Sequence, residues 1–181
     1  MATKPVTEEE FLHAIKLSSS PETFTAEQPL YKGSCHCSFL SYTVRIDLTN
    51  PHPLNNAILT RCNCTICVKY GLLIAVPAPA SSFTLTSPPG GRDELKDYKT
   101  SERIHRWLCP TCGVQVFMEG TYSFQGMEVS YLRVNAATLD GRADGGKMVE
   151  LKDVKVRYIG GRDPACLAEG VKDEPWSGGL R

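Results

Sequence analysis

The stretch Cys62-Asn-Cys-Thr-Ile-Cys67 holds three cysteines, and two pairs, Cys35-His-Cys37 and Cys109-Pro-Thr-Cys112, stand before and after it. Of the eight cysteines in the chain, only Cys166 lies apart from these groups. Isolated structural thiols would not cluster in this way. A disulfide framework is also disfavoured, because cysteines one residue apart are awkward disulfide partners and the first residues show no secretion signal. The clusters therefore predict metal binding, and Cys166 is expected to be a plain buried or half-buried thiol.

The spacing of the clustered cysteines predicts two zinc ions per chain. Thiolates are soft ligands, so sulfur-rich clusters select Zn²⁺ or iron–sulfur centres. A closed structural zinc site takes four ligands, usually two pairs from distant parts of the chain, whereas a catalytic zinc takes three and keeps one open position. The predicted structural site consists of four cysteines: Cys35, Cys37, Cys109 and Cys112. The predicted catalytic site consists of three cysteines: Cys62, Cys64 and Cys67.

Other partitions of the cysteines stay open on spacing alone, such as Cys62 and Cys64 with the last pair. His36, between two cysteines, is expected to point away from a metal that both neighbours hold. His105 is expected to pack in the core or on the surface. Gly113 directly follows the last pair and can adopt the left-handed backbone that closes a zinc knuckle.

The composition is that of an ordinary globular chain and excludes several classes of function. The 181 residues include 20 Lys and Arg against 20 Asp and Glu, so the chain lacks the basic excess that favours binding to nucleic acid. The longest apolar stretch, 71–80, contains two prolines and is far shorter than the roughly 20 residues of a membrane helix. Because the first ten residues lack the apolar core of a signal peptide, we expect a cytoplasmic protein that binds neither membranes nor nucleic acid.

Short segments of alternating hydrophobicity from Gly33 onward predict a mainly β fold with few helices. In the clearest of them, Tyr42, Val44 and Ile46 share one parity. The expected strands are 39–48, 55–61, 72–76, 82–86, 104–108, 114–118, 127–134 and 154–159. The expected domain organisation is an N-terminal extension over 1–30 with a short helix at about 8–17, a zinc-binding domain over 31–162, and an irregular tail over 163–181 that Trp176 is placed to pin.

Three motifs resemble the family of glutathione-dependent formaldehyde-activating enzymes, which includes the domain of centromere protein V. The motifs are Gly33-Ser-Cys-His-Cys37, Cys62-Asn-Cys-Thr-Ile-Cys67 and Trp107-Leu-Cys-Pro-Thr-Cys-Gly113, with weaker support from Leu95-Lys-Asp-Tyr98 and Val134-Asn-Ala-Ala-Thr-Leu-Asp140. The resemblance covers about 32–141 and implies an Mss4-like folded β-sheet sandwich stitched by zinc. The chain departs from the family pattern at Ser38, where glycine is common.

The resemblance also implies an activity, that of a carbon–sulfur lyase working in the synthetic direction. Glutathione would be the thiol, formaldehyde the electrophile and S-(hydroxymethyl)glutathione the product. A three-thiolate zinc suits this reaction, because its open position can hold a thiol in the nucleophilic thiolate form. Candidate partners for the two carboxylates of glutathione are the cations near the motifs: Arg61, Lys69, Arg92, Arg106 and Arg142.

Two alternatives to this activity stay open. One is an enzyme of the same type with a different small-molecule substrate, for example in secondary metabolism. The other is a non-catalytic zinc module that binds protein. In either case the chain is expected to be a monomer or a homodimer.

Overall fold

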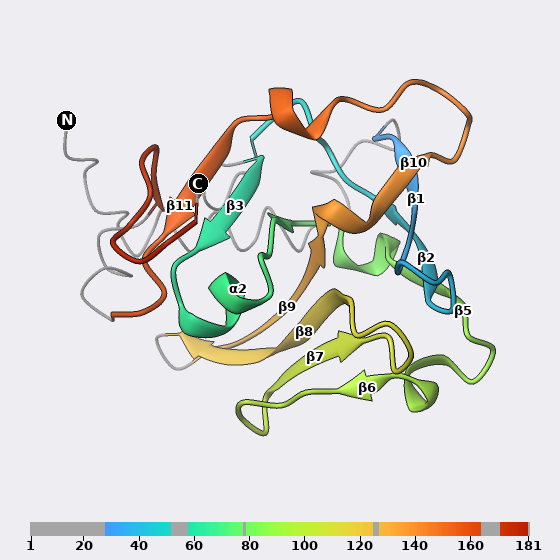
Figure 1. The fold of residues 1–181 in the computed structure, drawn as a ribbon, viewed down its shortest axis with the longest axis horizontal. Helices are drawn as coiled ribbons and strands as arrows, with labels where there is room; N and C mark the ends of the chain where they lie inside the picture. Colours follow the sequence, from blue (N-terminus) through green and yellow to red (C-terminus); the bar gives the residue numbers. More distant parts are fainter. Residues whose placement is uncertain (1–27, 52–57, 78, 125–126, 164–170, 181) are drawn as a thin grey trace.

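The chain forms two β-sheets, seen in a computed structural model that describes residues 28–51, 58–77, 79–124, 127–163 and 171–180 (Figure 1). The smaller sheet has four antiparallel strands in the order β10–β1–β2–β5. Their bounds are Leu30–Ser34 for β1, Ser41–Arg45 for β2, Thr84–Ser87 for β5 and Leu139–Arg142 for β10. The mainly β fold expected from the sequence is thus confirmed.

The larger sheet has eight strands in the order β12–β11–β3–β4–β9–β8–β7–β6. Their bounds are Leu59–Cys62 for β3, Ile74–Ala75 for β4, Lys96–Asp97 for β6, Ile104–Leu108 for β7, Gln115–Phe124 for β8, Met127–Asn135 for β9, Val156–Ile159 for β11 and Val171–Lys172 for β12. β3 and β11 are parallel, and the other neighbours are antiparallel. The described helices are short: α2 (Thr65–Lys69) and the 3-10 turns η2 (Ala80–Ser82), η3 (Gly91–Glu94), η4 (Ala136–Thr138) and η5 (Leu151–Asp153).

The two sheets share one hydrophobic core. In β2 and just beyond it, Tyr42, Val44 and Ile46 are buried, as their shared parity predicts. They belong to the same cluster as Phe117 of β8 in the other sheet, and Phe83 connects the two layers, with ring centroids 5.2 Å from Tyr42 and 4.6 Å from Phe117. Burial of each such large side chain contributes about 1.5–3 kcal/mol before the cost of ordering the chain.

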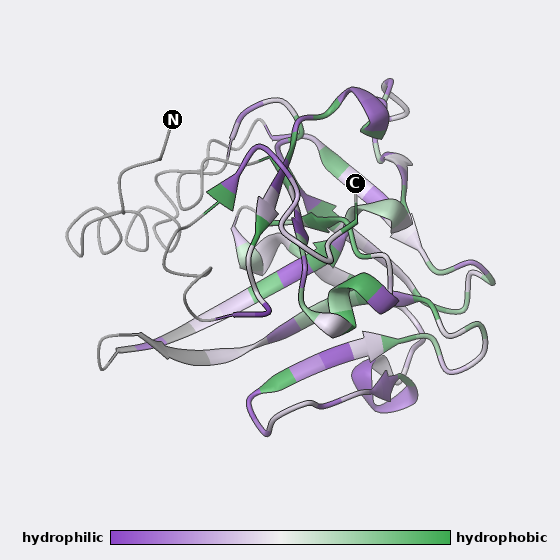
Figure 2. Cartoon of the chain, turned by 60° about the vertical axis from the view of Figure 1, so that its left-hand side comes forward, coloured by the Kyte–Doolittle hydropathy of each residue, from purple (hydrophilic) through white to green (hydrophobic). Residues whose placement is uncertain are grey.

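The cysteines lie in the turns and strand ends of this framework. One pair occupies the β1–β2 turn and another the β7–β8 turn, so these two pairs come from different sheets. The triplet begins at Cys62, the last residue of β3, and continues through α2, which returns the chain to β4 (Figure 1). Hydrophobic residues (green) mark α2 in Figure 2, and this helix packs against the larger sheet.

Several predicted segments differ from the observed ones in length. The alternating segment 39–48 contains β2 as a five-residue strand, whereas 114–118 extends to a ten-residue strand in β8. The expected helix at 8–17 and Cys166 lie outside the described residues. None of the helices in the described part of the chain is long and apolar enough to cross a membrane.

Candidate metal centres

Four cysteine sulfurs from the two hairpin turns meet in one group, the four-cysteine group. Its members are Cys35, Cys37, Cys109 and Cys112, whose Sγ atoms all lie within 4.8 Å of one another. The Sγ atoms of Cys35 and Cys37 are 3.7 Å apart, and those of Cys37 and Cys109 are 3.6 Å apart. A tetrahedral zinc with Zn–S bonds of about 2.3 Å has sulfur–sulfur edges of about 3.8 Å. The residues present therefore fit a tetrahedral thiolate metal site.

The two turns of the four-cysteine group close in the same way. The backbone N–H of Cys35 donates to the carbonyl of Leu40 (2.9 Å), and that of Cys109 donates to the carbonyl of Val114 (3.0 Å). Each turn also directs an amide at a sulfur: Leu40 N–H donates to Cys35 Sγ (3.3 Å) and Cys112 N–H donates to Cys109 Sγ (3.5 Å). Amide donors stabilise negative charge on sulfur, so both turns are built to hold thiolates.

Both turns need a residue in the left-handed conformation. Gly113 supplies it in the second turn with φ 74°, at no steric cost. In the first turn Ser38 adopts φ 61°, although left-handed backbone costs a non-glycine residue about 1–2 kcal/mol. This geometry gives a physical reason for glycine at that position in the resembling family.

Replacing Ser38 with glycine is therefore expected to stabilise the chain. We expect Ser38→Gly to raise the free energy of unfolding by about 0.5–1 kcal/mol. Glycine removes the steric cost of the left-handed backbone in the folded chain, and its greater conformational entropy in the unfolded chain offsets part of this gain. Urea titration of the metal-loaded chain measures the change. Ser101→Gly is a matched control, because Ser101 is exposed and has no positive φ, and it should be neutral or destabilising. Equal effects of the two substitutions would contradict the explanation.

Burial gives a second reason to place a cation in the four-cysteine group. Cys35 and Cys109 are 2% and 1% exposed and belong to the main core cluster. Burial raises the pKa of the Cys35 thiol to about 12, so without a cation this sulfur stays protonated at neutral pH. A metal ion would reverse that preference, because its charge compensates the buried thiolates.

The other three clustered cysteines form a separate group, the three-cysteine group. Cys62, Cys64 and Cys67 have Sγ atoms within 4.8 Å of one another, and no other His, Cys, Asp or Glu of the described residues joins them. Cys64 is the N-cap of α2 and Cys67 lies one turn later, so the helix directs both sulfurs toward the end of β3. The N–H of Cys64 donates to Cys62 Sγ (3.4 Å). Three soft donors without a fourth protein ligand fit a metal that keeps one open position.

The thiols of this group already favour negative charge at its centre. Hydrogen bonds from the thiols of Cys62 and Cys67 lower the pKa of Cys64. The hydrogen bonds that the Cys67 thiol makes with Cys62 and Cys64 raise the pKa of Cys67. One thiolate is thus stabilised by two neighbouring thiols. A cation in place of those protons would allow all three sulfurs to ionise, which is how metal binding releases protons.

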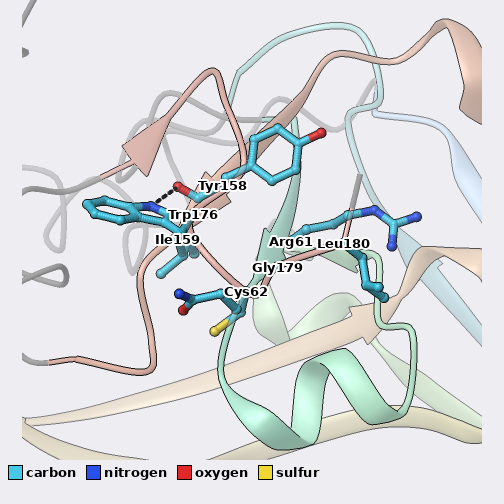
Figure 3. A pocket seen from close by; sticks show the side chains of 8 residues that line it. Arg61, Cys62, Tyr158, Ile159, Trp176, Gly179 and Leu180 are labelled. Atoms are coloured by element: carbon cyan, nitrogen blue, oxygen red, sulfur yellow. Dashed lines mark hydrogen bonds between the residues drawn. The ribbon is translucent and has the colours of Figure 1, made fainter.

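Two different surroundings flank the three-cysteine group. On one side Cys67 packs with Leu72 and Ile74 in a small apolar cluster, and Met118 of β8 packs against it. On the other side Cys62 stands in the wall of a small pocket that has no room for a water molecule (Figure 3). The remaining lining residues are Arg61, Asn63, Tyr158, Ile159, Trp176, Gly179 and Leu180.

The structure separates the candidate cations by their partners. Arg92 and Arg142 bind carboxylates of the chain itself, those of Glu119 and Asp144. Arg106 is 8% exposed, donates to Thr100, and has a buried Nε without a partner among the described residues.

Arg106 also has a neighbour that the sequence did not single out. Met118 lies opposite Arg106 on one side and Arg133 on the other. Residues directly opposite in antiparallel strands share a face, so two arginines flank the methionine that packs near the three-cysteine group. Of the other candidates, Arg61 lines the small pocket and Lys69 ends α2.

The two histidines near the motifs lie outside both cysteine groups. His36 is exposed between its cysteine neighbours. His105 Nδ1 lies 2.7 Å from Asp97 Oδ2, and its ring stacks on Trp107. His105 thus packs as expected, and the ring nitrogens of His36 do not join the four-cysteine group, in line with the expectation that it points away from a metal there.

The sequence did not single out Asn63, which lies between Cys62 and Cys64, or Gly161, which contacts Cys62. Asn63 is 6% exposed although it is polar. A side chain on Gly161 would place its Cβ 2.4 Å from Cys62 Sγ. The only signal in the sequence is the position of Asn63 between two cysteines. Nothing near Gly161 indicates that it lies against a sulfur nearly 100 residues earlier in the chain.

Comparison with known proteins agrees with this geometry. The sequence model of the glutathione-dependent formaldehyde-activating enzymes matches residues 30–151, about two thirds of the chain and all seven clustered cysteines. A protein of Sordaria macrospora named "Putative glutathione-dependent formaldehyde-activating enzyme" is 27% identical over 162 residues, which cover 81% of this chain. The same alignment spans 65% of that relative's length.

Proposed function

Because the chain belongs to the family of glutathione-dependent formaldehyde-activating enzymes, we propose that it is a zinc-dependent carbon–sulfur lyase working in the synthetic direction. It would join glutathione, or another small thiol, to formaldehyde or a related small electrophile. The three-cysteine group is the observation that carries this proposal. Among the described residues it offers three sulfur ligands without a fourth protein ligand, whereas the four-cysteine group already offers a complete ligand set.

The proposed reaction needs neither oxidant nor reductant. The thiol sulfur bonds to the carbonyl carbon, the carbon–oxygen double bond becomes single, and the thiol proton ends on the new hydroxyl. Thiols add to formaldehyde unaided, so the protein has to supply the thiolate and its position. A Zn²⁺ bound by the three-cysteine group would supply the positive charge that stabilises a substrate thiolate.

Different residues of the chain would hold the metal and exclude water from it. Cys62, Cys64 and Cys67 would hold the metal. The apolar cluster around Leu72 and Met118 keeps water from one side of it, which strengthens the attraction between a cation and an incoming thiolate.

A direct assay tests the proposed reaction. The zinc-loaded chain is mixed with glutathione and formaldehyde, and NMR exchange spectroscopy measures the rate of interconversion of glutathione and S-(hydroxymethyl)glutathione. We expect a rate at least about tenfold above the uncatalysed one, as positioning alone can provide. A rate equal to that without protein would refute this substrate pair, and the same assay with other thiols and aldehydes would then test the broader class.

Arg133 offers a test of how the thiol is bound. Together with Arg106 it would attract the carboxylates of glutathione to the face that carries Met118. We expect Arg133→Met to raise KM for glutathione about tenfold, the usual effect of losing one charge-assisted hydrogen bond, and to leave the reaction of uncharged 2-mercaptoethanol unchanged. Exposed Arg103 is the matched control, and Arg103→Met should change neither the KM for glutathione nor the reaction of 2-mercaptoethanol. Equal losses with both thiols would show that Arg133 does not act on the carboxylates.

A further inference from the structure

Residues 171–180, here called the C-terminal strap, lie beside the three-cysteine group and outside the residues that match the family model (Figure 3). The strap begins with β12, which pairs with β11. The indole N–H of Trp176 donates to the carbonyl of Tyr158 in β11 (3.2 Å), and the ammonium of Lys172 lies 3.4 Å from the centre of the Trp176 ring. The strap is therefore fixed to the larger sheet at its edge.

Asn63 connects this strap to the three-cysteine group. Its Nδ2 donates to the carbonyl of Ser177 in the strap (3.1 Å), and its Oδ1 accepts from the N–H of Arg162 (3.0 Å). Its own N–H donates to the carbonyl of Ile159 (3.2 Å). A buried amide that finds partners at both ends is held in one orientation, since losing either bond would leave a polar group unsatisfied. Because its neighbours in sequence are Cys62 and Cys64, the orientation of Asn63 also fixes the backbone that carries those two sulfurs.

Close packing adds to these hydrogen bonds. Gly161 lies against Cys62 so closely that a Cβ would approach its sulfur to 2.4 Å. Gly179 of the strap lies against Asn63, where a Cβ would be 3.4 Å from that of the asparagine. The C-terminal part of the chain thus contacts Cys62 and Asn63 directly, while the four-cysteine group is made by two hairpin turns elsewhere in the fold.

We propose that Asn63 is a positioning residue through which the C-terminal strap holds Cys62 and Cys64 ready for metal binding. This inference rests on the proposed metal site of the three-cysteine group but not on its catalytic activity. A loop fixed before binding loses less conformational entropy when the metal enters, and residues that orient metal ligands typically contribute 10–100-fold to metal affinity. The affinity of the three-cysteine group should therefore depend on Asn63 and on the strap, and the affinity of the four-cysteine group should not.

Cobalt(II) titration of the full-length chain tests the inference without any assay of activity. Co²⁺ bound by thiolates absorbs strongly, so each equivalent of cobalt that a cysteine group binds can be followed in the titration. The equivalent of cobalt that Cys64→Ser no longer binds is the one that belongs to the three-cysteine group. We expect Asn63→Ala to weaken that equivalent about 10–100-fold and to leave the other unchanged. Asn50→Ala is the matched control, because the bonds of Asn50 within the described part of the chain stay in an exposed loop, to Asp47 and Thr49.

Variants of the strap separate positioning from a loss of folding. Trp176→Ala removes the ring that pins the strap and should weaken the same equivalent of cobalt. Trp176→Phe keeps an aromatic ring but loses the indole N–H that donates to Tyr158, and should have a smaller effect. If Asn63→Ala weakens both equivalents alike, or leaves both unchanged, the inference is wrong. Since cobalt affinity is the readout, a chain without lyase activity can still support the inference, and an active chain can still overturn it.

Discussion

Replacing Cys109 with serine is expected to unfold the chain, because the four-cysteine group joins two hairpin turns of different sheets. Cys37 and Cys109 stand 72 residues apart in sequence, yet their sulfurs are 3.6 Å apart. Zinc bound by sulfur-rich sites in small domains contributes about 10–16 kcal/mol at neutral pH, which is as large as the entire stability of a typical domain, about 5–15 kcal/mol. Loss of one ligand would leave three sulfurs for the ion and weaken this contribution.

Circular dichroism and intrinsic fluorescence measure this loss of structure. The zinc-loaded wild type should melt cooperatively, and Cys109→Ser should show no cooperative transition. A strong chelator should have the same effect on the wild type, more easily as the pH falls, because protons compete with the metal for thiolates. Cys64→Ser, the same exchange in the three-cysteine group, is the control and should remain folded. A cooperative transition of Cys109→Ser at the wild-type temperature would show that the four-cysteine group does not stabilise the fold.

The sequence predicted strands well where alternation and turn residues agree, and less well where tertiary contacts set the length. Residues 104–108 form β7 as expected, because the Cys-Pro-Thr-Cys turn ends the strand sharply. β8 continues to Phe124, well past the predicted end, because it pairs along its length with β9. α2 was not predicted, since five residues are too few to show helical periodicity and the helix depends on its position between β3 and β4.

Spacing alone left open which cysteine clusters share a metal, although the clusters themselves were likewise accessible from spacing, because each turn delivers its sulfurs locally. The residues that surround the sulfurs were not accessible from the sequence. Asn63 binds partners 99 and 114 residues later in the chain, and no local pattern records such a contact. The five candidate cations looked alike in sequence, and only their contacts in the folded chain distinguish Arg106, opposite Met118, from Arg92, which binds Glu119. Residue type identified the chemistry of the sites, whereas their access and orientation depend on contacts between distant parts of the fold.

Replacing Cys64 with serine is expected to abolish the proposed activity and leave the fold intact. Cys64 is the N-cap of α2 and its side chain makes no capping hydrogen bond. Serine is one of the preferred N-cap residues, so the exchange should keep the helix or stabilise it slightly. A hydroxyl is a far poorer ligand than a thiolate for a soft metal site, and the group would keep only two sulfurs. We expect the catalysed rate to fall at least about 100-fold, since the charge that stabilises the substrate thiolate is lost.

Three measurements on Cys64→Ser separate a lost site from a lost fold. The metal content should drop by the equivalent that the three-cysteine group binds, the melting temperature should stay within a few degrees of that of the wild type, and the exchange rate of glutathione with formaldehyde should approach the uncatalysed one. Thr65→Ser is the matched control, because Thr65 is the exposed neighbour of Cys64 in the same helix and should keep full activity. If Cys64→Ser folds, loses that metal equivalent and still catalyses the reaction at the wild-type rate, the three-cysteine group is not the catalytic centre. In that event the proposed function would have to be sought at another site on the chain, because the four-cysteine group offers no open position for a substrate.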